Sequence, residues 1–468
     1  MIMIDTRSLP LLCLVFASCA ARPAGYDDRL SAWQRRLDAG ALERGAAPSG
    51  SSDGDSGEDS DGRDGIDEST ELGALLRHAR ANNPGLLGAF QRWKEALERV
   101  PQVTALPKPR FSFTSYLREV ETRVGPMESR FALTQMFPWF GKLDLAGESA
   151  FEASEAAREL LEATRLELDQ RIRDAWYELA WLEQAIIVTD GNRELLTHWE
   201  SVARARLETG LGRHSDVIRA QVELGKLEDR AATLLDMRRP LEARLNAALG
   251  RPPDAPLPRP SLPLPAPPRI DDAALASTLL TTSPALRAME YRVRAAQHGI
   301  DLADKAFYPD FFIGADYTVI GTALNPATPG SGDDAVAVTL GLDLPVWRSS
   351  NRAGQREAEA QVKRARLEQD EMRNRLSAEL EMALYRFRDA DRRVGLYQGS
   401  LIPKGEESIR SVDTAYQAGD GGFLDLIDAE RVLLEFQLQG ARAEADRAKA
   451  AADIERITGI DLHPEPRS

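Results

Sequence analysis

A long stretch without proline constrains this chain more than any other feature. No proline occurs between Pro138 and Pro240, and the segment FEASEAARELLEATRLELDQRIRDAWYELAWLEQAIIVTD places apolar residues at helical spacing with charges between them. At 1.5 Å per residue, a helix over residues 142–208 would be roughly 100 Å long. Such a rod cannot be buried within one globular domain, so it must pack against other rods, from this chain or from a neighbour, in coiled-coil-like geometry. Taken alone, the pattern also fits a structural coiled-coil protein.

The chain is built from two similar halves. Four ordered pairs of segments match at an offset of about 200 residues that drifts to about 209, which is typical of a duplicated domain rather than of a short solenoid unit. The pairs are NNPGLLGAF (82–90) with TSPALRAME (282–290), PKPRFSFTSYL (107–117) with FYPDFFIGADY (307–317), FPWFGKLDLAGE (137–148) with LPVWRSSNRAGQ (344–355), and ETGLGRHSDVIRAQ (208–221) with QAGDGGFLDLIDAE (417–430).

Each half predicts the same order of elements: a helix, two strands, a very long helix, a Gly-rich turn and a last helix. In the first half we expect helices over 71–100, 142–208 and 214–248, with strands over 110–118 and 129–137. In the second half we expect helices over 272–305, 350–416 and 423–458, with strands over 310–320 and 334–344.

Composition sets the domain boundaries. The stretch 47–70 is Gly, Ser and Asp with almost nothing to bury, which predicts a disordered tether, whereas the alternating prolines of 251–269 predict a stiff linker. The expected segments are a signal peptide (1–18), an N-terminal segment with the acidic tether (19–70), a first repeat (71–250), the Pro-rich linker (251–269), a second repeat (270–460) and a tail (461–468).

The N-terminus is typical of an exported protein. An apolar run after Arg7 ends in small residues and in FASC, which resembles the lipobox of bacterial lipoproteins, and that resemblance makes Cys19 the lipidated first residue of the mature chain. An ordinary signal peptide with an incidental cysteine is the alternative. No other stretch reaches the roughly 18 apolar residues of a transmembrane helix, so a membrane crossing would have to use strands. The pI near 5.1 and the charge of −15 argue against a nucleic-acid partner.

The expected strands alternate apolar with small or polar residues. In AVAVTLGLDL (335–344) one face carries Val336, Val338, Leu340, Leu342 and Leu344, and the other carries Ala337, Thr339, Gly341 and Asp343. This alternation fits a half-buried strand of a soluble sheet or a membrane β-barrel strand with lipid on one side and a polar lumen on the other. The strands alone leave both open, and the long helices favour the membrane reading.

A proline–aromatic corner joins the second strand to the long helix in both halves. Proline ends the ladder of hydrogen bonds, and amphipathic aromatic residues are favoured at a membrane interface. Gly141 permits a sharp bend in the first half. We expect Lys142 and Arg348 to face water or lipid headgroups, and the alternative is a plain turn with a buried tryptophan. The corner residues are Pro138, Trp139, Phe140, Gly141, Pro345 and Trp347.

These features together resemble the TolC family of outer-membrane efflux channels, including its lipidated members, over residues 71–460. The resemblance implies an α+β membrane protein, a duplicated helix–β-hairpin–long helix–helix unit. It also implies a homotrimer with a twelve-stranded β-barrel continued by a periplasmic α-helical barrel. The expected location is the outer membrane of a Gram-negative-type bacterium, with a lipid anchor. The expected partners are outer-membrane lipid, a periplasmic adaptor (membrane fusion) protein and an inner-membrane pump.

The resemblance also assigns roles to the Gly-rich turns. Asp425 and Asp428 match the aspartates that ring the narrowest point of the closed pore, where six carboxylates of a trimer would favour cations. Tyr416 and Asp216 match the bond network that holds the tip closed, but the family arginine of that network falls at Gly421. The alternative for Asp425 and Asp428 is that they are ordinary carboxylates at a helix N-terminus, favoured there by the helix dipole. The tips expected to meet the adaptor contain Gly210, Gly212, Gly419 and Gly422.

Other functions have less support from the sequence. A structural envelope lipoprotein with a coiled-coil spacer and no pore is the main alternative, and the alternating strands argue against it. The chain contains no phosphate loop and no metal-ligand cluster, so we expect neither an enzyme nor a cofactor. The exported substrate, whether a drug, a metal ion or a polypeptide, cannot be read from the residues.

Overall fold

The computed structural model describes residues 66, 70–264, 268 and 270–462. The expected signal peptide, Cys19 and almost all of the expected tether lie outside these residues. The chain divides into two compact units. The first holds Arg92–Arg158 and Ala288–Asp370 in its described part, and the second holds the remaining described residues.

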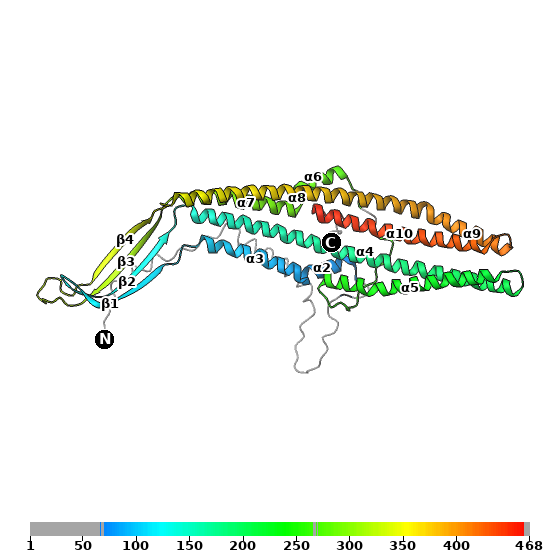
Figure 1. The fold of residues 1–468 in the computed structure, drawn as a ribbon, viewed down its shortest axis with the longest axis horizontal. Helices are drawn as coiled ribbons and strands as arrows, with labels where there is room; N and C mark the ends of the chain where they lie inside the picture. The colour runs from blue at the N-terminus through cyan, green and yellow to red at the C-terminus, as the bar shows by residue number, and fades with distance from the viewer. Residues whose placement is uncertain (1–65, 67–69, 265–267, 269, 463–468) are drawn as a thin grey trace, which may run out of the picture. The chain divides into compact units, whose positions relative to one another are not determined.

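The first unit contains one four-stranded antiparallel sheet (Figure 1). Its strands β1 (Arg110–Thr122), β2 (Gly125–Phe137), β3 (Asp310–Ile320) and β4 (Ala335–Asp343) lie in the order β1-β2-β3-β4. The central pairing, β2 with β3, joins the two halves of the sequence. Among the described strands, β1 and β4 are therefore edges that pair on one side only.

The first hairpin is longer than the sequence predicts. We expected a gap between the strands at 119–128, but β1 and β2 continue toward a tight turn at Arg123 and Val124, where Thr122 Oγ1 donates a hydrogen bond to Gly125 O at 2.6 Å. The residues of this extension are mixed in charge and break the alternation. Cross-strand pairing nevertheless extends the ladder to Thr122 and Gly125, past a register shift after Ser115.

The second unit is helical. Helix α4 (Lys142–Glu208) contributes residues to both units, and its bounds match the expectation. In the second unit it is joined by α5 (His214–Leu249), α6 (Asp272–Thr282), α9 (Ile402–Ala418) and α10 (Phe423–Thr458). One core cluster packs Leu275 and Leu279 of α6 against Leu380, Leu384 and Phe387 of α8 (Arg348–Leu396) and against the end of α10. The expected duplicated α+β architecture is confirmed.

The first helix of each half is broken, although the sequence predicts a continuous one. Asn83 separates α2 (Leu72–Asn82) from α3 (Pro84–Thr104), and Ser283 separates α6 from α7 (Pro284–Lys305). A proline disfavours helical backbone in the residue before it but is well suited to a first helical turn. At Asn83 the side chain also acts as a cap, since its Oδ1 accepts a hydrogen bond from Leu86 N at 3.1 Å.

A glycine closes the last helix of each half against the corresponding break. Gly250 ends α5 with φ of 76°, and Gly459 ends α10 with φ of 74°. A Cβ at Gly250 would lie 3.0 Å from Asn82 O, and a Cβ at Gly459 would lie 3.0 Å from Thr282 O. Both glycines have a left-handed backbone and lie close to a carbonyl oxygen at the helix break, so the same contact occurs in both halves of the chain.

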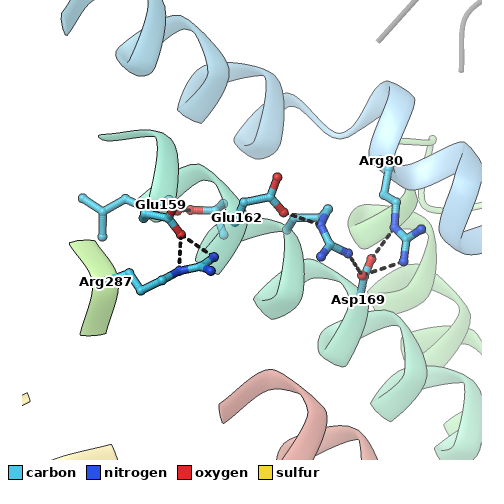
Figure 2. Close-up of polar contacts among 8 residues, drawn as sticks. Arg80, Glu159, Glu162, Asp169 and Arg287 are labelled. Atoms are coloured by element: carbon cyan, nitrogen blue, oxygen red, sulfur yellow. Dashed lines mark hydrogen bonds and ion pairs between the residues drawn. The ribbon is translucent and has the colours of Figure 1, made fainter. Parts of the chain in front are cut away.

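Ion pairs attach both broken helices to α4 within the second unit (Figure 2). Arg80 of α2 donates two hydrogen bonds to Asp169, from Nε to Oδ1 at 3.0 Å and from Nη2 to Oδ2 at 2.7 Å. Arg287 of α7 binds Glu159, whose side chain is buried, at 2.7 Å. Bidentate and charge-assisted contacts of this kind fix orientation as well as distance.

The long helix of the second half is also interrupted. The sequence predicts one helix over 350–416, but α8 ends at Leu396 and a π-helix over Tyr397–Leu401 precedes α9. Pro403 is the second residue of α9, and in a regular helix its ring would clash with a carbonyl of the preceding turn. The wider π-turn accommodates that ring.

Candidate functional site

The two Gly-rich turns have the same backbone geometry. Gly210, after α4, has φ of 76°, and Gly419, after α9, has φ of 89°. Gly212 N donates to Arg206 O at 2.9 Å, and Gly421 N donates to Ala415 O at 3.1 Å. The left-handed residue lets each helix end and reverse within a few residues.

Gly421 is the position where the resemblance leads us to expect an arginine. A Cβ there would lie 3.0 Å from Tyr416 N and 3.2 Å from Ala415 C, which is tighter than most real Cβ contacts. The turn would have to give by a few tenths of an ångström before any larger side chain could occupy this position.

Another arginine lies beside Tyr416. The guanidinium of Arg206, from the last turn of α4, donates to Tyr416 O and lies over the Tyr416 ring, with 4.8 Å between Cζ and the ring centroid. Tyr416 is 4% exposed and its ring lies 5.4 Å from that of Phe423. Burial raises the pKa of the Tyr416 phenol; the charge of Arg206 opposes this shift, and that of Asp216 adds to it. The expected neighbours Tyr416 and Asp216 are thus brought within electrostatic reach.

The sequence did not point to Arg206. At the offset that superimposes the two turns, Arg206 corresponds to Ala415, so the internal repeat carries no sign of a paired arginine. Its role depends on α4 and α9 meeting in three dimensions, and no local pattern encodes that.

Asp425 and Asp428 lie on an exposed part of the first two turns of α10. Asp425 Oδ2 accepts a hydrogen bond from Gly422 N at 3.3 Å, so capping of the helix start is present. Asp428 Oδ1 lies 3.4 Å from Arg431 Nη1. Both carboxylates remain accessible to solvent, so the capping hydrogen bond of Asp425 is compatible with a role of both aspartates at a pore.

A second polar cluster, which the sequence did not predict, ties α5 to α10. Arg431 donates two hydrogen bonds to Glu223, and Lys226 Nζ donates a third at 2.8 Å. Glu430 lies beside them and is 2% exposed. Burial works to raise the pKa of Glu223, but the hydrogen bonds from Arg431 and Lys226 lower it overall.

The corner residues occupy the ends of the sheet as expected, with one correction. Trp139 N donates to Asp310 Oδ1 at 2.7 Å and the Trp139 ring stacks on Tyr308, whereas Phe140 and Trp347 are exposed. Lys142, expected to face water or headgroups, instead binds Asp310 Oδ1 at 2.6 Å with its side chain 18% exposed. Asp310 starts β3, so this ion pair joins the corner of one half to a strand of the other.

The sheet has one apolar face and one polar face. In register, Phe113, Phe131, Tyr317 and Val336 form one row of the apolar face, and Phe111, Leu133, Ala315 and Val338 form the next. On β4 the apolar side chains are exposed by 58 to 76%. On the opposite face Arg130 binds Asp316 at 2.7 Å, and Thr339 donates to the same carboxylate at 3.3 Å.

No group of three or more His, Cys, Asp or Glu side chains in the described ranges is placed to hold a metal ion. Within the same ranges, no helix is both long enough and apolar enough to cross a bilayer.

Comparison with known proteins agrees with this geometry. The chain is 23% identical to the pyoverdine export outer membrane protein OpmQ of Pseudomonas putida over 425 residues, which are 84% of this chain and 86% of that protein. Its fold is similar to that of the outer-membrane channel OprN, with a TM-score of 0.70, 20% identity, and 84% and 91% of the two chains covered. The outer membrane protein VceC of Vibrio cholerae gives a TM-score of 0.69 and 20% identity over 83% and 96%.

The family model described as outer membrane efflux protein matches residues 75–251 and 275–460, which is more than half of the chain. The matched segments carry both hairpins of the sheet, both proline–aromatic corners and both Gly-rich turns. The resemblance to the TolC family is thereby confirmed, and this chain belongs to the outer membrane efflux protein family.

Proposed function

We propose that this outer-membrane efflux channel works as a passive trimeric conduit from the periplasm to the exterior. The observation that carries the proposal is the sheet, which has an exposed apolar face, a polar opposite face and two unpaired edges. Open edges are not tolerated in lipid, so four strands alone cannot cross a membrane. Three copies, joined β4 to β1, would give a closed barrel of twelve strands with the Arg130–Asp316 face toward a watery lumen.

The exposed corner aromatics fit the membrane edge of that barrel. Phe140 and Trp347 are exposed by 72 and 77%, which suits residues that lie in the headgroup region. In the same proposal the lipid on Cys19 adds an anchor to the outer membrane.

The Gly-rich turns are the proposed docking tips for a periplasmic adaptor, which would link the channel to an inner-membrane pump. Gly210, Gly419 and Gly422 are exposed and Gly212 is half-buried. Leu211, within the first turn, is 75% exposed, and an apolar side chain at a turn suits a protein partner. The cargo is then chosen largely by the pump. One relative, OpmQ, is a pyoverdine export protein.

Asp425 and Asp428 form the proposed pore gate, together with Tyr416 and Asp216. In a trimer six exposed carboxylates would surround the axis, favouring cations and repelling anions. Arg206, rather than an arginine at position 421, is the proposed tie that holds the tip closed, because it bonds the end of α9 to the end of α4.

Single-channel recording of the detergent-extracted protein in a planar bilayer, with its oligomeric mass measured on the same sample, tests the proposal. We expect a trimer with discrete cation-selective openings. The double variant Asp425→Ala/Asp428→Ala should reduce the cation preference several-fold. The control double variant Asp229→Ala/Asp236→Ala changes two exposed aspartates of α5 and should leave the cation preference unchanged. A water-soluble monomer without conductance would instead support a coiled-coil spacer, and unchanged selectivity in the first double variant would contradict the gate.

A further inference from the structure

A cavity of about 380 Å³ separates part of α5 from α10 within the second unit. Three charged side chains of α5 line it (Glu223, Lys226 and Arg230), and three of α10 do so (Glu430, Arg431 and Glu435). Apolar residues such as Leu227 and Leu434 complete the lining. Helix α9 packs on α10 but contributes no residue to this lining in the described chain.

Two of the three cations that line the cavity, Arg431 and Lys226, bind the same carboxylate, that of Glu223. Arg431 donates to Glu223 from Nε at 3.2 Å and also from Nη2, and Lys226 binds the same side chain. Glu223 and Arg431 are 208 positions apart in sequence, so their ion pair connects the last helix of one half to the last helix of the other. It connects them a few turns behind the Gly-rich turns.

In the part of the chain that the structure describes, Glu430 receives no hydrogen bond from Arg431 or Lys226. Its side chain is 2% exposed, and Oε1 has no hydrogen-bond partner among the described residues. A buried carboxylate without a partner is costly when it is ionised, because neither water nor a cation replaces its hydration. Burial, and after it the negative charge of Glu223, raise the pKa of Glu430 to about 7, although Arg431 acts in the opposite direction.

We propose that Glu430 is a proton-controlled latch between α5 and α10. When Glu430 is protonated, the two helices stay closed around the cavity. When it is ionised, its charge competes with Glu223 for Arg431 and weakens the ion pair that joins α5 to α10, so the two helices separate behind the turns. The effect on conduction rests on the proposed function, whereas the separation of the helices does not.

The direction of the pH dependence follows from linkage. The closed arrangement holds the Glu430 proton with a pKa of about 7, and a solvated glutamate has the ordinary value of 4.5. The closed arrangement therefore has its full advantage below about pH 4.5 and loses it progressively as the pH rises through about 7. Each unit of pKa difference changes the ratio of closed to separated helices tenfold.

Spin labels test the latch directly. Glu228→Cys on α5 and Val432→Cys on α10 are exposed positions for a nitroxide pair, and the native sequence has cysteines only at Cys13 and Cys19. Full-length doubly labelled protein, diluted with unlabelled protein, would be measured by pulsed electron paramagnetic resonance at pH 5 and pH 8. We expect a longer-distance population that grows at least tenfold relative to the short one between these two pH values.

Three variants separate the latch from a general effect of pH. Glu430→Gln should keep the short distance at both pH values. Glu223→Gln should release Arg431 toward Glu430 and move the transition to lower pH. Glu435→Gln, an exposed glutamate of the same cavity, should behave as the parent. Identical distances at pH 5 and pH 8, or a pH response that survives Glu430→Gln, would overturn the proposal.

Conductance of the same samples keeps the two proposals apart. A pH-dependent distance in a protein that never conducts would retain the latch and reject the conduit. Conductance with a distance that does not respond to pH would retain the conduit and reject the latch.

Discussion

The helical hairpins of the two halves share their turns but differ in the helix that leads into them. In the first half α4 is continuous from Lys142 to Glu208, whereas in the second half a π-helix separates α8 from α9. Pro403 follows that π-helix, and the corresponding position in α4 is Glu194. After the duplication, the long helix of the first half is continuous and that of the second half is interrupted, yet each leads into an equivalent Gly-rich turn.

The difference teaches which constraints a duplication retains. The left-handed glycines that end the helices, Gly210 with Gly419 and Gly250 with Gly459, are kept in both halves, because no other residue fits that backbone without strain. Side chains have diverged: Asp428 corresponds to Arg219, and Arg206 corresponds to Ala415. The helical hairpin of the first half thus provides Arg206, which contacts Tyr416 of the other half. The hairpin of the second half provides Asp428, the second carboxylate of the proposed gate.

The largest expected effect comes from breaking the continuous long helix. Glu194→Pro would place a proline in the interior of α4, where no π-turn accommodates it, and should cost about 3 kcal/mol or more of unfolding free energy. Pro403→Ala should change it by less than about 1 kcal/mol, because the π-turn already accommodates the ring. Urea unfolding followed by far-ultraviolet circular dichroism measures both.

Glu194→Ala is the control for the first substitution, since Glu194 is exposed and its truncation should be nearly neutral. If Glu194→Pro and Pro403→Ala proved equally costly, the two long helices would not differ in the way that their helix breaks indicate.

A smaller effect is expected where the halves are most alike. Gly250→Ala and Gly459→Ala should each cost about 1–2 kcal/mol, since both force an alanine into a left-handed conformation close to a carbonyl oxygen. Gly225→Ala, in the interior of α5 with nothing within 4 Å of its Cβ, should instead stabilise the protein by about 0.5–1 kcal/mol. Thermal unfolding of the three variants checks this, and unequal costs at the two caps would show that the two contacts are not equivalent.

The smallest effect concerns the joint between the two hairpins. Arg206→Ala removes a half-buried guanidinium from Tyr416, and a net contribution of about 1 kcal/mol would accelerate local amide exchange in the following turn roughly fivefold. Arg204→Ala, which removes an exposed pairing with Glu200, serves as the control and should leave that exchange unchanged. Unaltered exchange in Arg206→Ala would mean that the tip is held by packing of Tyr416 and Phe423 alone.

The sequence predicts features of this fold that are local or repeated. The bounds of α4 and β3, the order of elements and both Gly-rich turns are as predicted, because helical spacing, alternation and glycine act over a few residues. The break at Asn83 was missed although Pro84 marks it, since the amphipathic pattern continues across it. The π-helix was missed for the same reason.

Much of the candidate site is not predictable in this way. Arg206 on Tyr416 and Arg431 on Glu223 are contacts between residues about 210 positions apart, and nothing within either segment indicates its partner. The exposed positions of Asp425 and Asp428 agree with the gate assignment, which remains a prediction.

The pairing of β2 with β3 has a consequence for assembly. It joins the two halves inside one chain, and in a closed ring of three chains the β4–β1 contact would join the halves of neighbouring chains in the same antiparallel manner. A chain with a single hairpin would need six separate bodies to complete the same ring. Each associating body loses translational and rotational freedom, so covalent fusion of two halves removes three of those losses before the proteins meet.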